Sequence, residues 1–217
     1  IDLCPVGALT SKPFAFTARS WELRKTESID VLDAVGSSIR VDSRGGEVMR
    51  IVPRLNEDVN EEWISDKSRF ACDGLSKRRL DRCYVRKDGK LEEASWAQAF
   101  AATAEALKGV SGDQAAAIAG DLADCESMTA LKDLMTGLGS NHMDCRQDGA
   151  KLGGARAGYL FNTTIAQIED ADAILIVGAD PRWEASLVNA RIRKRYLRGG
   201  LKVGVIGAQR DLTYPYD

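Results

Sequence analysis

The sequence predicts an α/β protein with part of a doubly wound parallel sheet, preceded by a small β-rich segment. Two observations support this fold class. Residues 169–207 have the pattern of a strand, a helix and a second strand, and the apolar period changes from alternating to helical after about residue 83. Because parallel strands need a crossover connection, usually a helix, this alternation indicates an open α/β sheet.

The strand–helix–strand unit is the clearest element. Residues 171–178 form a short apolar run closed by glycine, as expected for a strand buried on both faces of a parallel sheet. Residues 184–198 predict a helix that ends at Gly199-Gly200. Its buried stripe is expected to contain Leu187, Val188, Ile192 and Tyr196. Residues 201–206 give the second strand. Ligands of such a sheet bind at the carboxyl ends of its strands, which here are residues 178–183 and the loop after Gly207.

Residues 95–144 continue the alternation. Ser95-Trp-Ala-Gln98 is a capping box that begins a helix ending near Gly109, and a small-residue strand follows at 115–119. A second helix is expected over 124–138, then a loop and a short strand. The inward-facing side chains of the two helices are expected to be Trp96, Phe100, Leu107, Met128, Leu131, Met135 and Leu138.

The β-rich segment contains one clear hairpin, over residues 38–53. Apolar residues at 39, 41 and 48 alternate with polar neighbours, and Arg44-Gly45-Gly46 supplies the turn.

The composition is that of an ordinary globular protein, with 44% hydrophobic and 29% charged residues among 217. Lys+Arg 30 against Asp+Glu 32 leaves no basic surface for nucleic acid, so we expect no nucleic-acid partner. No apolar run approaches the roughly 20 residues of a membrane span.

The chain has neither an initiator Met nor a signal peptide, and its α/β unit lacks a return strand. We therefore expect it to be a piece of a longer protein.

The five cysteines are widely and irregularly spaced, without a C-x-x-C pair: Cys4, Cys72, Cys83, Cys125 and Cys145. This spacing argues against a zinc site or a disulfide framework and gives no reason to expect the thiols to meet. Free thiols indicate a reducing compartment. Cys4-Pro5 has the form of the last ligand of a bacterial-type iron–sulfur run, C-x₂-C-x₂-C-x₃-C-P. A buried cysteine beside a turn proline is the alternative.

The stretch Cys-Pro-Val-Gly-Ala-Leu-Thr-Ser-Lys-Pro-Phe-Ala-Phe-Thr-Ala-Arg-Ser-Trp-Glu-Leu at 4–23 resembles the large iron–sulfur subunit of NADH:quinone oxidoreductase, respiratory complex I. The resemblance implies that Cys4 is the fourth ligand of a [4Fe-4S] cluster whose other ligands lie upstream of Ile1. It also implies three parts: 1–20, the end of the iron–sulfur region; 21–83, a degenerate 4Fe-4S domain; and 84–217, a truncated Rossmann-like domain resembling molybdopterin oxidoreductases.

Some bacterial members of this family, and many molybdopterin enzymes, carry a cysteine triplet at the position of residues 24–36, where this chain has no cysteine. Cys72 resembles the fourth ligand of that lost cluster and is interpreted as a small buried thiol. We expect Cys72, Cys83, Cys125 and Cys145 to be core thiols, and the sequence does not say whether they have a further role.

The resemblance to molybdopterin enzymes also bears on molybdenum. Residues 139–144 resemble the stretch before their metal ligand, which would fall near Ala150, and Ala cannot ligate a metal. Cys145 comes several residues too early, and 178–184 resembles their pterin-nucleotide loop. We therefore predict no molybdenum cofactor. His142, the single histidine, is expected to be structural.

The implied function is that of a fragment of the electron-transferring subunit, which supplies Cys4 and a scaffold. The intact, proton-translocating enzyme would move electrons from NADH through flavin and iron–sulfur clusters to quinone. Its other peripheral-arm subunits would be the partners, without direct membrane insertion, on the cytoplasmic side of the bacterial inner membrane or the matrix side of the mitochondrial one. Alone, the fragment is expected to be non-catalytic and to hold no cofactor. The alternatives are a fragment of a catalytic molybdopterin oxidoreductase and a non-redox interaction module.

Overall fold

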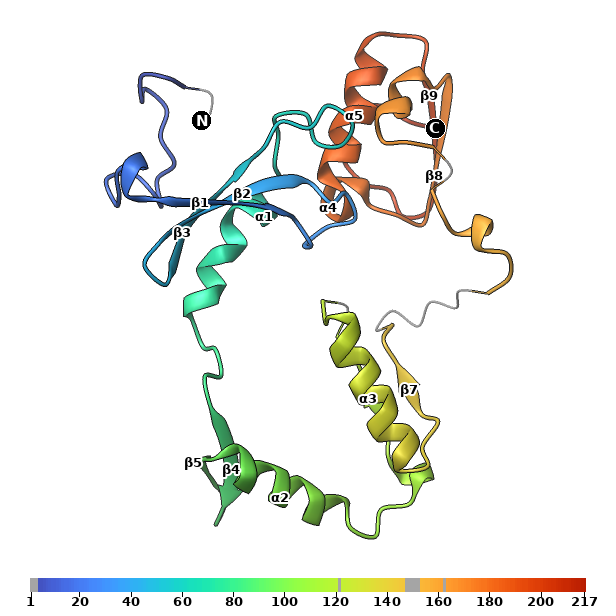
Figure 1. Ribbon diagram of the computed structural model, residues 1–217. Helices are drawn as coiled ribbons and strands as arrows, with labels where there is room; N and C mark the ends of the chain where they lie inside the picture. Colours follow the sequence, from blue (N-terminus) through green and yellow to red (C-terminus); the bar gives the residue numbers. More distant parts are fainter. Residues whose placement is uncertain (1–3, 121, 147–152, 162) are drawn as a thin grey trace. The chain divides into compact units, whose positions relative to one another are not determined.

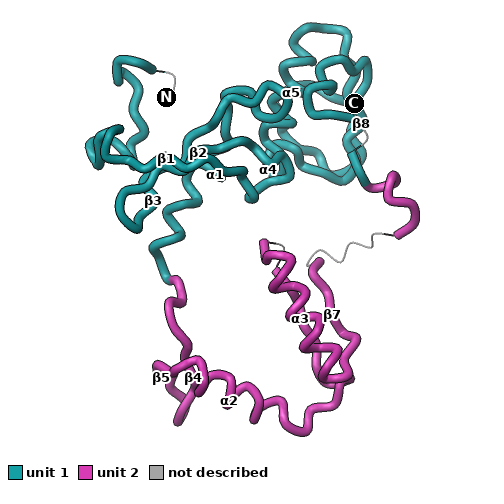
Figure 2. Tube along the Cα trace, in the orientation of Figure 1, with its two compact units in different colours: residues 1–78, 160–217 teal, residues 79–159 magenta. Residues whose placement is uncertain are grey.

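The computed structural model describes residues 4–120, 122–146, 153–161 and 163–217. The chain forms two compact units, which are coloured separately in Figure 2. Unit 1 contains residues 1–78 and 160–217, and unit 2 contains residues 79–159. Each unit is described by itself.

Unit 1 begins with an antiparallel sheet of three strands in the order β1-β2-β3 (Figure 1). The strands are β1 (Arg24–Ile29), β2 (Ser38–Arg44) and β3 (Glu47–Pro53), and the short 3₁₀ turn η1 (Ser20–Glu22) precedes them. The predicted hairpin at 38–53 is confirmed, with Gly45 at a φ of 61° in its turn. The sequence did not predict β1, because all six of its residues are exposed and carry no apolar alternation.

The chain then crosses to a short helix, α1 (Asp66–Phe70), followed by the 3₁₀ segment η2 (Ala71–Ser76). The intervening loop is fixed by Asn60, which is only 2% exposed. Its Nδ2 donates to the carbonyls of Arg54, Glu61 and Trp63, and its Oδ1 accepts from the amide of Ser38. Buried amide groups of this kind are normally fully hydrogen-bonded.

The second part of unit 1 is the predicted strand–helix–strand unit. Strands β8 and β9 pair in parallel, which confirms the crossover, and Gly199 and Gly200 end the helix at φ values of 84° and 79°. The elements are η5 (Ala166–Asp170), β8 (Ala173–Val177), α4 (Pro181–Glu184), α5 (Ser186–Leu197) and β9 (Lys202–Ile206).

The core of unit 1 lies between these elements and the segment that follows β9. Its buried members are Ile168, Ile176, Ile192, Leu201, Val203, Leu212 and Tyr214, with Val188 and Tyr196 packed against them. This confirms Val188, Ile192 and Tyr196 of the predicted apolar stripe, whereas Leu187 is buried but is not part of this cluster. The Tyr214 hydroxyl donates to Asn189 Oδ1 at 2.8 Å, and burial raises the pKa of Tyr214 to about 12.

The prediction that the strands are buried on both faces is wrong. Ile176 is buried, but its neighbours Leu175 and Val177 are each 63% exposed, and Ile206 of β9 is 59% exposed. Side chains alternate between the faces of a strand, so one face of the β8–β9 pair is packed and the other is open. Within the described residues this sheet has two strands, and the doubly wound arrangement stays a prediction.

A cluster of charges joins the two parts of unit 1. Glu169 accepts from Arg191 Nη1 at 3.1 Å and from Lys194 Nζ at 3.0 Å, and it also pairs with Arg198. Arg191 donates onward to the carbonyl of Glu57 at 2.8 Å. Burial opposes ionisation of Glu169, but its hydrogen bond to Lys194 and the neighbouring positive charges lower its pKa overall. Helix α5 is thereby tied to the loop before α1.

Unit 2 begins with an unpredicted hairpin of β4 (Cys83–Lys87) and β5 (Lys90–Ala94). Helix α2 (Trp96–Leu107) follows, and the capping box is confirmed: Ser95 Oγ accepts from the Gln98 amide, and Gln98 Oε1 accepts from the Ser95 amide. The predicted burial of Trp96 and Phe100 is wrong, since these side chains are 70% and 65% exposed. Their rings pack against each other instead, with centroids 5.7 Å apart.

The rest of unit 2 follows the predicted order. Strands β6 (Ala117–Ile118) and β7 (Met143–Asp144) pair in parallel around helix α3 (Cys125–Gly137). The 3₁₀ turns η3 (Gly112–Gln114) and η4 (Arg156–Gly158) complete the unit. The inward face of α3 is confirmed, with Met135 buried and Met128, Leu131 and Leu138 partly buried. Ala150 lies outside the described residues.

Candidate functional site

Cys4 begins a run of turns over residues 4–17, called here the Cys4 turns, which precedes the sheet of unit 1. The backbone N–H groups of the turn that follows lower the pKa of the Cys4 thiol, chiefly those of Leu9 and Val6, with smaller contributions from Ala8 and Gly7. Their effect outweighs the opposing effect of burial. The turn therefore favours the thiolate, which is the form of cysteine that binds metals.

Cys4 opens onto a cavity of about 290 Å³ formed within unit 1 by four segments. These are the Cys4 turns, β3, α1 and η2. Its wall contains two thiols, three charged side chains and the aromatic ring that Arg50 contacts: Cys4, Cys72, Arg50, Arg69, Asp73 and Phe14. The cavity therefore places a thiolate-favouring sulfur beside an aromatic ring and charged groups.

Arg50 of β3 links the Cys4 turns to the sheet. Its guanidinium lies 4.3 Å from the centroid of the Phe14 ring, and its Nε donates to Asp42 Oδ2 at 2.8 Å. Asp42 is fully buried and also accepts two hydrogen bonds from Arg40, at 2.7 and 3.0 Å. Burial alone would raise the pKa of Asp42, but the two arginines outweigh it and lower that pKa.

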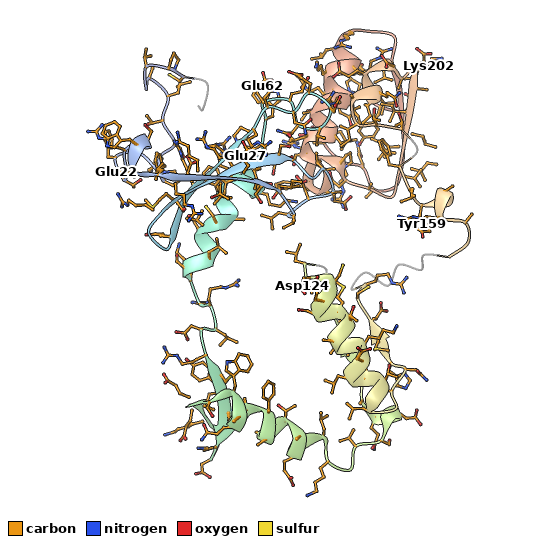
Figure 3. The ribbon with its side chains drawn as sticks, viewed as in Figure 1. Glu22, Glu27, Glu62, Asp124, Tyr159 and Lys202 are labelled. Atoms are coloured by element: carbon orange, nitrogen blue, oxygen red, sulfur yellow. The ribbon has the colours of Figure 1, made fainter. Side chains whose placement is uncertain are left out.

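A second link joins the same turns to the tip of the β2–β3 hairpin. Arg44 donates through Nη1 to the carbonyl of Thr17 and to Glu22 Oε2, both at 3.2 Å. Glu22, labelled in Figure 3, also accepts from the amide of Arg19. The hydrogen bond from the Arg19 amide, and then the interaction with Arg44, lower the pKa of the exposed Glu22 carboxyl.

Cys72 lines the same cavity as Cys4, although their spacing in sequence gave no reason to expect this. Its thiol donates to the carbonyl of Arg69 at 3.7 Å. Burial, and then the neighbouring Asp73, raise the pKa of Cys72. Cys72 is therefore a protonated, half-buried thiol, chemically unlike Cys4.

The other three cysteines lie in unit 2. Cys83 is half-buried in β4, whereas Cys125 and Cys145 are exposed, so the prediction of core thiols is wrong for these two. Across the part of the chain that the structure describes, no group of three or more His, Cys, Asp or Glu side chains could hold a metal ion. Cys4 therefore belongs to no such group within these residues.

The loops at the carboxyl ends of β8 and β9 pair with each other. Arg210 Nε lies 3.5 Å from Asp180 Oδ2, and Arg182 forms an ion pair with Asp211. The charged groups of the 178–184 loop are therefore engaged within the chain.

His142 has an exposed side chain, 3.9 Å from Asp113 Oδ1, and its carbonyl accepts from the amide of Ala117 at 2.9 Å. Its backbone thus helps to join β6 to β7. No helix among the described residues combines the length and apolar character needed to cross a membrane.

Two family models match the chain. Molybdopterin oxidoreductase matches residues 79–217, and the 4Fe-4S domain of the NADH-ubiquinone oxidoreductase NDSU1/NuoG-like type matches residues 23–73.

Curated relatives match along the whole chain. It is 55% identical to the mitochondrial NADH-ubiquinone oxidoreductase 78 kDa subunit of Neurospora crassa, over 100% of this chain and 30% of that protein. It is 54% identical to the mitochondrial NADH dehydrogenase [ubiquinone] iron-sulfur protein 1 of Solanum tuberosum, over 100% of this chain and 30% of that protein. The chain thus spans 30% of the length of these relatives. It belongs to the molybdopterin oxidoreductase family, in the branch of the large iron–sulfur subunit of NADH:quinone oxidoreductase.

Proposed function

We propose that this chain supplies Cys4 as one ligand of a [4Fe-4S] cluster and otherwise serves as a scaffold in a longer iron–sulfur subunit. The observation that supports this most strongly is the place of Cys4 on the wall of the cavity, beside a turn at residues 6–9 whose backbone N–H groups lower the pKa of its thiol. A lowered pKa favours the thiolate, the form of cysteine that binds metals.

The chemistry that a [4Fe-4S] cluster supplies when bound is one-electron transfer. The chain's own part is to hold the Cys4 sulfur as a thiolate and to anchor its turns on β3. Four thiolates normally hold such a cluster, and the residues described here provide one at this cavity. We propose that the remaining ligands lie outside the 217 residues.

Residues 23–73 match a 4Fe-4S domain, yet Cys72 is the single cysteine among them. One thiol cannot replace four, and the protonated state of Cys72 makes it a poor ligand. We propose that this segment keeps the domain's fold without a cluster of its own.

In the longer subunit we propose the domain limits 1–20, 21–83 and 84–217, with a doubly wound sheet in the last. The exposed apolar residues Leu175, Val177 and Ile206 support this, because a parallel sheet is normally covered on both faces. Further strands and helices would cover that face.

The relatives' names suggest the activity and the setting. We propose that the longer subunit takes part in electron transfer from NADH to quinone, together with other peripheral-arm subunits. Because the named relatives are mitochondrial, we place it at the inner membrane, on the matrix side. We propose that this chain itself does not bind NADH, flavin or quinone.

A catalytic molybdopterin oxidoreductase is the second candidate, favoured by the family match over residues 79–217. Against it stands Ala150 at the position where the resemblance expects a metal ligand. Metal analysis and pterin fluorescence of the denatured full-length protein distinguish the two. We expect neither molybdenum nor pterin, and stoichiometric molybdenum would favour the second candidate.

Reconstitution with iron and sulfide tests the ligand proposal. We expect the 217-residue chain to stay colourless and redox-silent, because it offers one thiolate of four. A longer chain that includes the segment before residue 1 should become brown and give a reducible signal. A cluster in the 217-residue chain would contradict the proposal, as would an iron-free longer chain.

A further inference from the structure

We propose that Arg50 is a positioning residue of the Cys4 site, which holds the Cys4 turns against β3 and raises the reduction potential of the cluster that Cys4 binds. This inference rests on the proposed function of Cys4. It starts from the wall of the 290 Å³ cavity, which Cys4 and Arg50 share.

Arg50 is held from two sides. Its Nε donates to the fully buried Asp42, and its guanidinium lies over the Phe14 ring, 4.3 Å from the centroid. Phe14 lies within the Cys4 turns, where its carbonyl accepts from Thr17 and its amide donates to Ser11. A cation over an aromatic ring is attracted by the ring quadrupole, so Arg50 links those turns to β3.

Arg50 brings a positively charged side chain to the cavity wall. Asp42 carries one negative charge and pairs with two guanidiniums, those of Arg40 and Arg50, so these three groups keep a net charge of +1. The other charged side chains among the described residues of the cavity wall are Arg69 and Asp73, one of each sign. Arg50 therefore adds a guanidinium to the wall that Cys4 shares, and its partner Asp42 is shared with Arg40.

The direction of the effect follows from electrostatics. Reduction adds an electron to an anionic cluster, and a nearby positive charge stabilises the more negative state. Charge and hydrogen bonding around a cluster are among the factors that set its potential. Arg50 should therefore make the cluster easier to reduce.

Arg40 offers a matched control. It pairs with the same carboxylate and carries the same charge, but it is not among the described residues that line the cavity. Replacing either arginine leaves Asp42 with one partner. A difference between the two variants therefore goes beyond the loss of an ion pair with Asp42, which both variants share.

The experiment uses the full-length subunit in its complex. Cys4→Ala first identifies the electron paramagnetic resonance signal of the cluster bound at Cys4. The midpoint potential of that signal, and its rate of loss to an iron chelator, are then measured in Arg50→Gln, Arg50→Lys, Arg40→Gln and Phe14→Leu. Arg50→Lys keeps the charge, and Phe14→Leu removes the ring.

We expect Arg50→Gln to shift the potential to a more negative value than Arg40→Gln does and to speed chelation, with Arg50→Lys largely restoring the potential. Phe14→Leu should speed chelation with a smaller shift in potential. If Arg50→Gln assembles no cluster while Arg40→Gln does, the positioning role of Arg50 is supported. The effect of Arg50 on the midpoint potential is then measured in Arg50→Lys.

The inference is overturned if Arg50→Gln and Arg40→Gln have equal potentials and equal chelation rates. It is also overturned if both variants lose the cluster to the same extent. A Cys4→Ala variant that keeps every signal overturns the proposed function instead.

Discussion

Asp42 and Arg50 face each other across β2 and β3 as register partners, and Arg50 Nε lies 2.8 Å from Asp42 Oδ2. The pairing lies at the position where the register of the hairpin shifts, between Asp42 and Ser43. Arg50 extends from there to Phe14 in the Cys4 turns. Arg50 thus connects the buried carboxylate of Asp42 to the turns that contain the proposed ligand Cys4.

Asp42→Ala should destabilise unit 1. It leaves two guanidiniums without their buried acceptor, and we expect the free energy of unfolding to fall by about 2 kcal/mol. Urea denaturation of the 217-residue chain measures the change. The control is Glu27→Ala in the same sheet, whose exposed carboxylate lies 3.4 Å from Arg54 and should contribute about 0.5 kcal/mol or less. Equal effects of the two variants would contradict the structure around Asp42.

The same carboxylate predicts an acid-dependent loss of stability. Because the pKa of folded Asp42 is lowered, its stabilising contribution is complete above the unfolded pKa of about 3.9 and is lost as the pH falls through the folded value. Denaturation of the parent chain and of Asp42→Asn between about pH 2 and 6 measures this. We expect the difference between them to shrink below about pH 4, and a constant difference would argue against the pairing.

Ile192→Asp should strongly destabilise the strand–helix–strand part. Ile192 is 4% exposed within the core cluster, so an aspartate there would be a buried charge without a partner, at a cost of about 3 kcal/mol or more. Leu197→Asp is the control on the same helix, since Leu197 is 64% exposed. Thermal melts of both variants test the packing, and an Ile192→Asp chain that melts like the parent would show that the core is assigned wrongly.

Gly112→Ala should destabilise unit 2. A Cβ at this position would lie 2.1 Å from the carbonyl oxygen of Gly139, so the loop between α3 and β7 must move. We expect a loss of about 1–3 kcal/mol. Gly137→Ala is the control, because nothing lies within 4 Å of its Cβ position and Ala favours a helix. Hydrogen exchange of residues 111–144 reads the local stability, and equal protection in both variants would contradict this close approach.

The sequence predicted well those elements whose secondary structure is determined by their own local residue pattern. The β8–α5–β9 unit has a four-residue apolar period closed by Gly199-Gly200, and the capping box at Ser95 is local chemistry. Strand β1 could not be found this way, because it is an exposed edge strand in which Ile29 is the one apolar residue. The β4–β5 hairpin was missed although its Asp88-Gly89 turn, with φ values of 49° and 81°, is a recognisable hairpin signal.

Helical periodicity shows which side chains share a face, but it does not show what covers that face. Trp96 and Phe100 do share a face of α2, yet both are exposed in this chain.

In the candidate site, the Cys4-Pro5 pair identified Cys4 as a candidate ligand from the sequence alone. The presence of Cys72 and Arg50 on the same cavity depends on tertiary packing of η2 and β3, which no local pattern encodes.

The central claim is that Cys4, and not Cys72, ligates the cluster. Electron paramagnetic resonance of the reduced full-length subunit carrying Cys4→Ala or Cys72→Ala tests it most directly. The two thiols line one cavity, so each variant is the control for the other. We predict that Cys4→Ala abolishes one [4Fe-4S] signal and that Cys72→Ala keeps all of them. A Cys4→Ala subunit with its full set of cluster signals would contradict the claim.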